Sequence, residues 1–210
     1  MLIRQSDSVS DENEWKQFLL THDFGEIIAP GINRELPLVA PTHFHFDGNS
    51  TVSLHFAFDN PIWEALKEKS LAILSVYGVY TYIPTSWNAN TNQNLQDGIP
   101  TSYYAAVQAV CTTEILDDAA DIAHILTLQL DHFQPEGGHA PVKEDMLPYG
   151  PFLGAIRGLK LTVTEVRAKF KFGGNKSSDH RLKIAELLIH RQAHNDTEAA
   201  EFILKSVDPS

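Results

Sequence analysis

The stretch that decides the fold runs from residue 42 to residue 56 and reads THFHFDGNSTVSLHF. Polar and apolar residues alternate on both sides of Asp47-Gly48-Asn49, and this period of two is typical of β-strands with one wet face and one dry face. Asp, Gly and Asn are residues that favour tight turns. The stretch therefore predicts a β-hairpin.

The length of the turn sets which residues of this hairpin face each other. A two-residue loop would place His43 opposite Leu54 and mix the two faces. A three-residue loop at residues 47–49 pairs His43 with Ser53 and Phe44 with Val52, which keeps each face consistent. We expect this second register. It gathers one polar face, on which His43 and His55 are diagonal neighbours, and its members are His43, His45, Ser53 and His55.

Three interpretations of this polar face stay open. It is a solvated sheet face with incidental histidines, as many antiparallel sheets have. It is a metal site built on the His43-x-His45 pair and His55, although no Asp or Glu lies in the two strands to complete it. It is a site for an organic anion, to which imidazole and hydroxyl groups offer hydrogen bonds.

Outward from the hairpin, β-like runs and helical patterns follow one another along the chain, and a polar segment over residues 86–98 predicts a loop. A helix is expected after Ser10 as N-cap, and another begins at Asn60-Pro61. We expect an α+β fold, a closed or half-closed antiparallel barrel with helices outside it, as one domain over residues 1–210. The other expected strands cover residues 25–29, 36–40, 71–83, 103–115 and 159–172, and the other expected helices cover residues 118–130, 179–191 and 197–207.

Charge and cysteine content exclude several classes of protein. Lys and Arg number 16 against 27 Asp and Glu, and the net charge of −11 repels nucleic-acid backbones, so we expect no direct nucleic-acid partner. The sequence has no apolar run long enough for a membrane span and no signal-peptide pattern at its start. The single cysteine, Cys111, lies in an apolar strand and predicts a buried, inert thiol. A cytoplasmic protein without a membrane partner is expected.

The residues His55 to Pro61 lead from the polar face directly into a predicted helix start at Asn60-Pro61. Free backbone N–H groups at such a start favour a phosphate or a carboxylate. An ordinary Asn-Pro helix start needs no ligand, so this signal is weak when taken alone.

Five ordered motifs connect the chain with a known family. They are Thr42-His43; His55-x-Ala57-x-x-Asn60-Pro61-x-Trp63; Tyr82-Ile83-Pro84-Thr85-Ser86-Trp87; Ile99-Pro100-Thr101-x-x-Tyr104-x-Ala106-Val107; and Lys169-Phe170-Lys171-Phe172-x-x-Asn175. From about Phe24 to Asp179 the chain resembles the PaiB-type FMN-binding split-barrel family. The resemblance implies a six-stranded Greek-key split β-barrel with flanking helices, a homodimer, and FMN in a groove near the subunit interface. Members of the family are labelled negative transcriptional regulators of protease and sporulation genes.

The resemblance also implies a set of cofactor-binding residues. Asn60, Lys169 and Lys171 are candidates for the FMN phosphate, which needs donors and cations. Aromatic walls and fixed polar partners for the flavin ring are expected from Ser86, Trp87, Thr101 and Tyr104. The matched motifs add Thr42, His43 and His55 to this set. The pattern implies no metal and names no catalytic residue.

Two departures from the family pattern fall in the expected site. Phe58 stands where the family has Arg, which leaves Lys169 and Lys171 as the nearest expected cations, and Ser102 stands where the family has Trp. The first hypothesis is an FMN-binding protein, with flavin-linked oxidoreductase activity and an indirect regulatory role left open. The alternative is a dimeric family member with a lost or altered cofactor, which binds another anionic small molecule or a protein.

Overall fold

The computed structural model describes residues 1–9, 11–90 and 92–207. Ser10, expected to cap the first helix, lies outside the described residues. The Asp11 carboxylate accepts hydrogen bonds from the N–H groups of Asn13 and Glu14 at 2.8 and 3.2 Å, and helix α1 (Glu12–Thr21) follows. Two of the N–H groups that every helix start leaves free are thereby satisfied.

One sheet contains seven strands in the order β2-β1-β5-β6-β7-β4-β3. The pairings of β1 with β2 and β5, and of β4 with β3 and β7, are antiparallel. The α+β class is confirmed, whereas the expected Greek-key connectivity stays a prediction. The strands are β1 (Phe24–Ala29), β2 (Leu38–His43), β3 (His45–Phe46), β4 (Thr51–Ala57), β5 (Leu71–Ile83), β6 (Thr101–Leu116) and β7 (Ile156–Lys171).

The described part of the chain has seven strands, as many as the local patterns predict and one more than the resemblance implies, and Phe44 interrupts the stretch over residues 42–46. The Phe44 side chain is fully buried, and its N–H donates to the carbonyl oxygen of Asp23 at 2.8 Å. On one side of Phe44, β2 pairs with β1, and on the other side, β3 pairs with β4. Because β2 and β3 lie at opposite ends of the strand order, this single interruption brings the two edges of the sheet together.

The hairpin register differs from the expected one by two residues. His45 faces Ser53 and Phe46 faces Val52. The reason is the Asp47 carboxylate, which accepts hydrogen bonds from the N–H groups of Asn49, Ser50 and Thr51 and so moves the three-residue turn to residues 48–50. Since the shift is an even number, the polar and apolar faces stay as expected.

The chain divides into two compact units, and strands β5, β6 and β7 contribute to both. The first unit holds Met1–Glu14, Tyr77–Ala106 and Arg167–Ser210, and the second holds Trp15–Val76 and Val107–Val166. The single domain expected from the sequence stays a prediction. None of the helices in the described part of the chain has the length and hydropathy needed to cross a bilayer.

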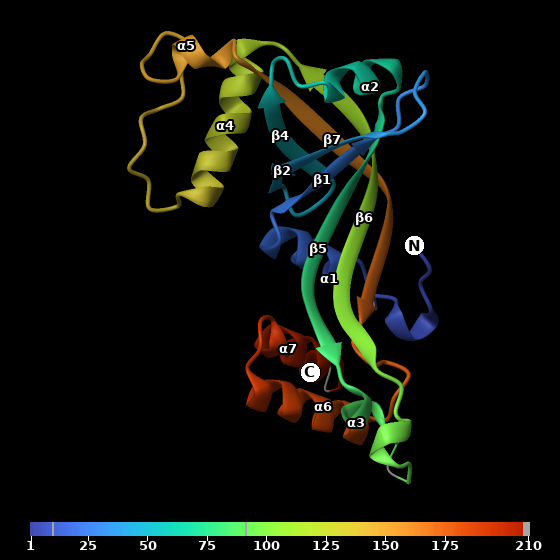
Figure 1. The fold of residues 1–210 in the computed structure, drawn as a ribbon. Helices are drawn as coiled ribbons and strands as arrows, with labels where there is room; N and C mark the ends of the chain where they lie inside the picture. The colour runs from blue at the N-terminus through green and yellow to red at the C-terminus, as the bar shows by residue number, and fades with distance from the viewer. Residues whose placement is uncertain (10, 91, 208–210) are drawn as a thin grey trace. The chain divides into compact units, whose positions relative to one another are not determined.

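The second unit holds the hairpin and its covering helices (Figure 1). Its core contains Leu54 of β4, Leu74 of β5 and Leu159 of β7, all fully buried. Helix α4 packs against β3 and β4, and the Asp118 side chain caps it, as expected, by accepting from the N–H of Ala120 at 2.9 Å. This unit contains α2 (Ile62–Glu68), α4 (Ala119–Phe133), α5 (Gly150–Leu153) and most of α1.

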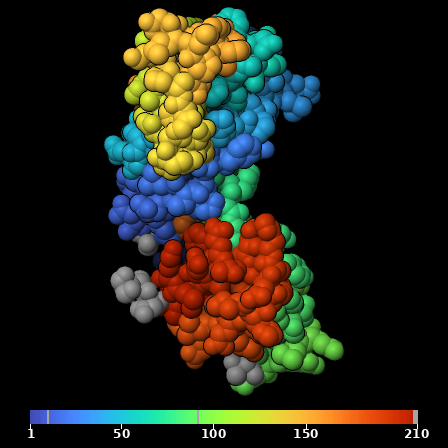
Figure 2. Space-filling model, turned by 90° about the vertical axis from the view of Figure 1, so that its left-hand side faces the viewer, coloured from blue at the N-terminus to red at the C-terminus, as the bar shows by residue number. Residues whose placement is uncertain are grey.

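The first unit holds helices α6 (Ser178–Arg191) and α7 (Asp196–Val207), which pack on each other and form one continuous surface in Figure 2. The polar segment over residues 86–98 is not a plain loop, because it contains part of helix α3 (Thr85–Asn88) and the 3-10 turn η2 (Leu95–Asp97). Asn94 caps η2 with its side chain, which accepts from the N–H of Gln96. The Asn94 side chain of this polar segment therefore stabilises a turn.

Candidate functional site

Four of the expected cofactor residues come together in the first unit. Strand alternation places Lys169 and Lys171 on one face of β7. The Lys171 ammonium group donates a hydrogen bond to Thr101 Oγ1 at 2.7 Å. The Nζ atoms of Lys169 and Lys171 lie 5.7 and 5.9 Å from the ring centroid of Tyr104. We call these four residues, Thr101, Tyr104, Lys169 and Lys171, the lysine cluster.

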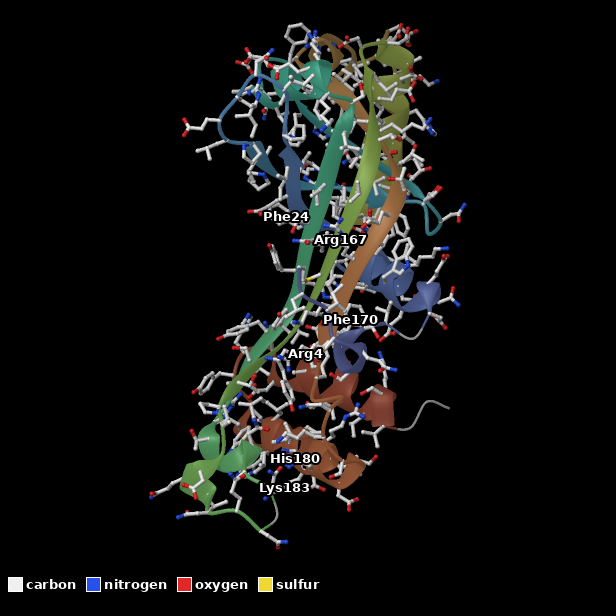
Figure 3. The ribbon with its side chains drawn as sticks, turned by 90° about the vertical axis from the view of Figure 1, so that its right-hand side faces the viewer. Arg4, Phe24, Arg167, Phe170, His180 and Lys183 are labelled. Carbon is white, nitrogen blue, oxygen red and sulfur yellow. The ribbon has the colours of Figure 1, made fainter. Side chains whose placement is uncertain are left out.

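The N-terminal segment supplies further charges to the lysine cluster. Lys169 Nζ donates to the carbonyl oxygen of Leu2 at 2.9 Å and lies 3.6 Å from Asp7 Oδ2, and Ser8 pairs with Lys169. Burial lowers the pKa of Lys171, and the positive charges of Lys169 and Arg4 lower it further, against the opposing effect of Asp7. Figure 3 labels Arg4 near the end of β7. Sequence reasoning missed Arg4, because nothing in residues 1–9 indicates that they pair with β7.

Ser86 and Trp87 lie on α3, also in the first unit. Ser86 lines a cavity of about 380 Å³ together with Tyr82, Pro84, Thr85, Leu95 and Gln96. The Arg191 guanidinium lies 4.7 Å from the Trp87 ring centroid, a cation–π distance. A Cβ atom at Gly98 would overlap the carbonyl oxygen of Thr85, so only glycine lets the chain that leads into β6 pass this close to α3.

His43 and His55 lie in the second unit, where Gln129 of α4 bonds to the half-buried His55 and Phe133 of α4 contacts the exposed His43. The His55 Nδ1 atom lies 2.7 Å from Gln129 Oε1, and the ring centroids of His43 and His55 are 5.5 Å apart. Burial lowers the pKa of His55, with a smaller contribution from His43, so the imidazole is neutral at pH 7. Together with Gln129, Phe133 and three other α4 residues, both histidines line a cavity of about 440 Å³.

The polar face is only partly covered, because His43 is exposed whereas His55 is half-buried and bonded to Gln129 of α4. The three interpretations of this face stay predictions. No group of three or more His, Cys, Asp or Glu side chains that could hold a metal ion occurs among the described residues. A close approach at Gly158, opposite His55 on β7, allows this covering, since a Cβ there would meet Ile125 of α4 at 2.7 Å.

Thr42 and Asn60 use their polar atoms within the second unit. The buried Thr42 hydroxyl donates to the His43 carbonyl oxygen at 2.8 Å. Asn60 Oδ1 accepts from the N–H of Ile62 at 3.0 Å, and the backbone oxygens of Asn60 and Pro61 accept from the next two N–H groups of α2. The helix start that the sequence offers to a phosphate thus has these three donors already satisfied.

A cation that the sequence did not indicate, Arg157, lies next to Phe58. The Arg157 guanidinium lies 4.1 Å from the centroid of the Phe58 ring, and its Nε lies 2.6 Å from Asp117 Oδ1. The expectation that Lys169 and Lys171 are the cations nearest to the FMN phosphate stays a prediction. A guanidinium from β7 lies beside the residue that replaces the family's arginine.

The model of a family described as "Putative FMN-binding domain" matches residues 1–165. The chain belongs to this family. The match confirms the resemblance seen in the sequence motifs, and FMN is the cofactor that membership assigns to the chain. The matched region ends before Lys169 and Lys171, so these two lysines lie outside the family model.

Relatives extend the match along the chain. "Protease synthase and sporulation protein PAI 2" of Bacillus subtilis (strain 168) is 22% identical over 206 residues, which cover 97% of this chain and 96% of that protein. Among solved structures, the FAD and heme binding protein from Mycobacterium smegmatis is 16% identical, covers 88% of this chain and 80% of that one, and has a TM-score of 0.59. The flavocytochrome Anf3 from Azotobacter vinelandii is 17% identical, with coverages of 79% and 69% and a TM-score of 0.56. At these identities the structures show the fold alone.

The donors of the lysine cluster fit FMN. A phosphate accepts hydrogen bonds and carries negative charge, and the cluster offers two ammonium groups and a hydroxyl. The Tyr104 ring lies beside both ammonium groups and is an aromatic surface of the kind on which flavins pack. Asp7 offsets part of the positive charge, and Arg4 adds to it.

Proposed function

We propose that this chain is an FMN-binding protein of the PaiB type whose lysine cluster holds the FMN phosphate. The observation that carries the proposal is the contact between Lys171 Nζ and Thr101 Oγ1 at 2.7 Å, next to the Tyr104 ring. This contact fixes an ammonium group and a hydroxyl beside one aromatic surface. FMN presents a dianionic group joined by a ribityl chain to a ring system, so the donor types and the cofactor match.

Electrostatics support the phosphate assignment. Burial lowers the pKa of Lys171, which means that the site stabilises its charged form less well than water does. An anion placed beside Lys171 reverses this effect, because a nearby opposite charge favours the ammonium form. The partly buried position also reduces solvent screening, so the attraction is stronger than that of an exposed lysine.

The ring-binding part of the proposal rests on Tyr104, Trp87 and Ser86. Tyr104 belongs to the lysine cluster, and Ser86 and Trp87 lie on α3. Asn88 of α3 donates a hydrogen bond to the carbonyl oxygen of Ile99, two residues before β6. We assign aromatic contacts to the two rings and a polar contact to Ser86. When bound, FMN supplies hydride and electron transfer, and the protein supplies binding and orientation.

A regulatory role of this chain, if it resembles that of its relative PAI 2, is indirect in this proposal. The net charge of −11 opposes contact with a DNA backbone. The single cysteine supports a cytoplasmic location. A gel shift with submicromolar affinity at about 0.15 M salt and a steep salt dependence would contradict the indirect role.

A homodimer is also part of the proposal. Tyr77, Tyr80 and Tyr82 of β5 are 62%, 56% and 50% exposed, and Tyr80 and Tyr82 alternate with buried residues along the strand. Exposed aromatic residues of this kind are enriched in protein interfaces, and symmetric pairing is the commonest way of covering them. Sedimentation that finds only a 23.4 kDa species at micromolar concentration would contradict the dimer.

Two measurements on the wild-type protein test the cofactor and its phosphate. The purified protein is expected to absorb between about 350 and 500 nm as flavoproteins do, or to gain this absorbance after incubation with FMN. Titration of FMN and riboflavin into the flavin-free protein compares the two affinities. FMN is expected to bind about ten-fold or more tightly than riboflavin, because only FMN carries the phosphate. Equal affinities would contradict the phosphate site, and no binding would favour the cofactor-free alternative.

A further inference from the structure

We propose that the cavity between α4 and the histidines of β2 and β4 is a second binding site, which takes an uncharged, mainly apolar molecule with a carbonyl group. It holds about 440 Å³, within the usual range of small-molecule pockets. The site lies wholly within the second unit and contains no residue of the lysine cluster. Its lining residues are His43, His55, Leu126, Gln129, Leu130, Phe133 and Gln134.

The observation that points to a ligand is the Gln129 amide. Gln129 is 4% exposed, and its Nε2 atom is buried without a hydrogen-bond partner. Buried amide N–H groups almost always have an acceptor, since leaving them unpaired costs free energy. The bond to His55 uses only Oε1 of this amide, so the Nε2 hydrogens are the part that has no partner. A ligand oxygen that accepts from Nε2 would satisfy this donor.

The partner of Gln129 fixes the hydrogen-bonding character of the site. Gln129 Oε1 can only accept, so His55 Nδ1, 2.7 Å away, carries the proton of this hydrogen bond. His55 Nε2 is then an acceptor, because burial keeps the ring neutral. The cavity thus offers amide N–H donors from Gln129 and an imidazole acceptor from His55.

The walls of the cavity determine the rest of the ligand. Leu126, Leu130 and the half-exposed Phe133 are apolar, and the Phe133 ring meets His43 edge to face with centroids 5.2 Å apart. No Lys or Arg is among the lining residues. An anion would lose its hydration there without gaining a cationic partner, so a neutral molecule is favoured. A carbonyl oxygen meets the Gln129 donors, and an apolar body fills the space along α4.

Three probes of one size distinguish these requirements. 2-Acetylnaphthalene has the carbonyl oxygen, 2-ethylnaphthalene has the same shape without it, and 2-naphthoate replaces the ketone by a charge. Isothermal titration calorimetry on the wild-type protein is expected to show that the ketone binds about ten-fold more tightly than 2-ethylnaphthalene and that 2-naphthoate binds most weakly. Equal binding of the ketone and 2-ethylnaphthalene, tightest binding of 2-naphthoate, or no binding of the ketone overturns the proposal.

The Gln129→Leu substitution assigns the preference to the amide. It is expected to lower the affinity for the ketone about ten-fold and to leave the affinity for 2-ethylnaphthalene unchanged or higher. The matched control is Gln17→Leu, the same substitution at an exposed position of α1. Gln129→Leu removes the unpaired Nε2 but also the acceptor of the His55 Nδ1–H, so the melting temperatures of Gln129→Leu and Gln17→Leu are measured to establish that both variants are folded. An unchanged ketone affinity in folded Gln129→Leu overturns the proposal.

An FMN titration separates this site from the flavin site. FMN affinity is expected to be the same in the wild type and in Gln129→Leu. Loss of FMN binding in Gln129→Leu would place the flavin in this cavity and overturn the inference of a second site.

Discussion

Arg191 and Asp196 form a two-point ion pair that joins the end of α6 to the start of α7. Arg191 Nε lies 2.7 Å from Asp196 Oδ2, and Arg191 Nη2 lies 2.7 Å from Asp196 Oδ1. Asp196 is fully buried, and its two oxygens also accept from the Thr81 hydroxyl and the Ala193 N–H at 2.6 and 2.9 Å. The pair thereby fastens both helices to β5 in the first unit.

Replacing Asp196 by Asn is expected to lower the free energy of unfolding by about 2 to 3 kcal/mol, because it leaves the Arg191 guanidinium with an uncharged partner and turns one acceptor into a donor. Urea denaturation measures the change. The control is Glu201→Gln, which removes a carboxylate from an exposed position of α7 and is expected to cost less than about 0.5 kcal/mol. Equal stabilities of the two variants would contradict the role of the ion pair.

The same carboxylate predicts a pH dependence of stability. Burial alone would raise the pKa of Asp196, but the hydrogen bonds from Arg191, Thr81 and Ala193 outweigh it and hold the pKa below its usual value. A folded-state pKa below the unfolded one stabilises the protein above the unfolded value, and this contribution is lost as pH falls through the folded pKa. The urea concentration at the midpoint of unfolding should therefore decrease as the pH is lowered from about 5 to about 3, and it should decrease less in Asp196→Asn. Parallel pH curves for both proteins would refute this.

Local sequence patterns predicted the strands and most helices well, because alternation and capping act over a few residues. Thr101, Tyr104, Lys169 and Lys171 were expected to bind one cofactor, and the structure brings their side chains together. Family motifs carried that expectation, since the two pairs lie 65 or more residues apart.

What sequence reasoning missed depends on long-range contacts. The strand pairing changes at Phe44 because the Phe44 N–H donates to the Asp23 carbonyl oxygen, and no local sequence pattern predicts that hydrogen bond. Arg4 reaches Lys171 and Arg157 reaches Phe58 only in the folded chain. Gly158 is the one signal in the sequence for the covering of His55 by α4, because a glycine inside a strand often marks a close approach.

Arg4→Ala is expected to lower the affinity for FMN about two- to three-fold and to leave the affinity for riboflavin unchanged. Arg4 is exposed, so its charge acts through solvent and contributes less than a buried group would. Fluorescence titration at low salt measures the effect, with Gln5→Ala as the neighbouring exposed control. An equal loss of riboflavin affinity would show that Arg4 acts on the fold rather than on the phosphate.

Cys111 is expected to be unreactive in the native protein. Burial raises the pKa of its thiol to about 12, and the side chain is fully buried in β6. Little thiolate therefore exists near pH 8. Ellman's reagent should label one thiol per chain in urea and almost none without it. Rapid labelling of the native protein would contradict the burial of Cys111.

The central claim, that the lysine cluster holds the FMN phosphate, is tested most directly by titrating FMN into Lys171→Ala. The exposed Lys160 of the same strand provides the matched control, Lys160→Ala. FMN affinity is expected to fall about ten-fold or more in Lys171→Ala, because a charge-assisted hydrogen bond is lost, and to change less than two-fold in Lys160→Ala. Riboflavin affinity should be the same in all three proteins. An unchanged FMN affinity in folded Lys171→Ala would contradict the claim.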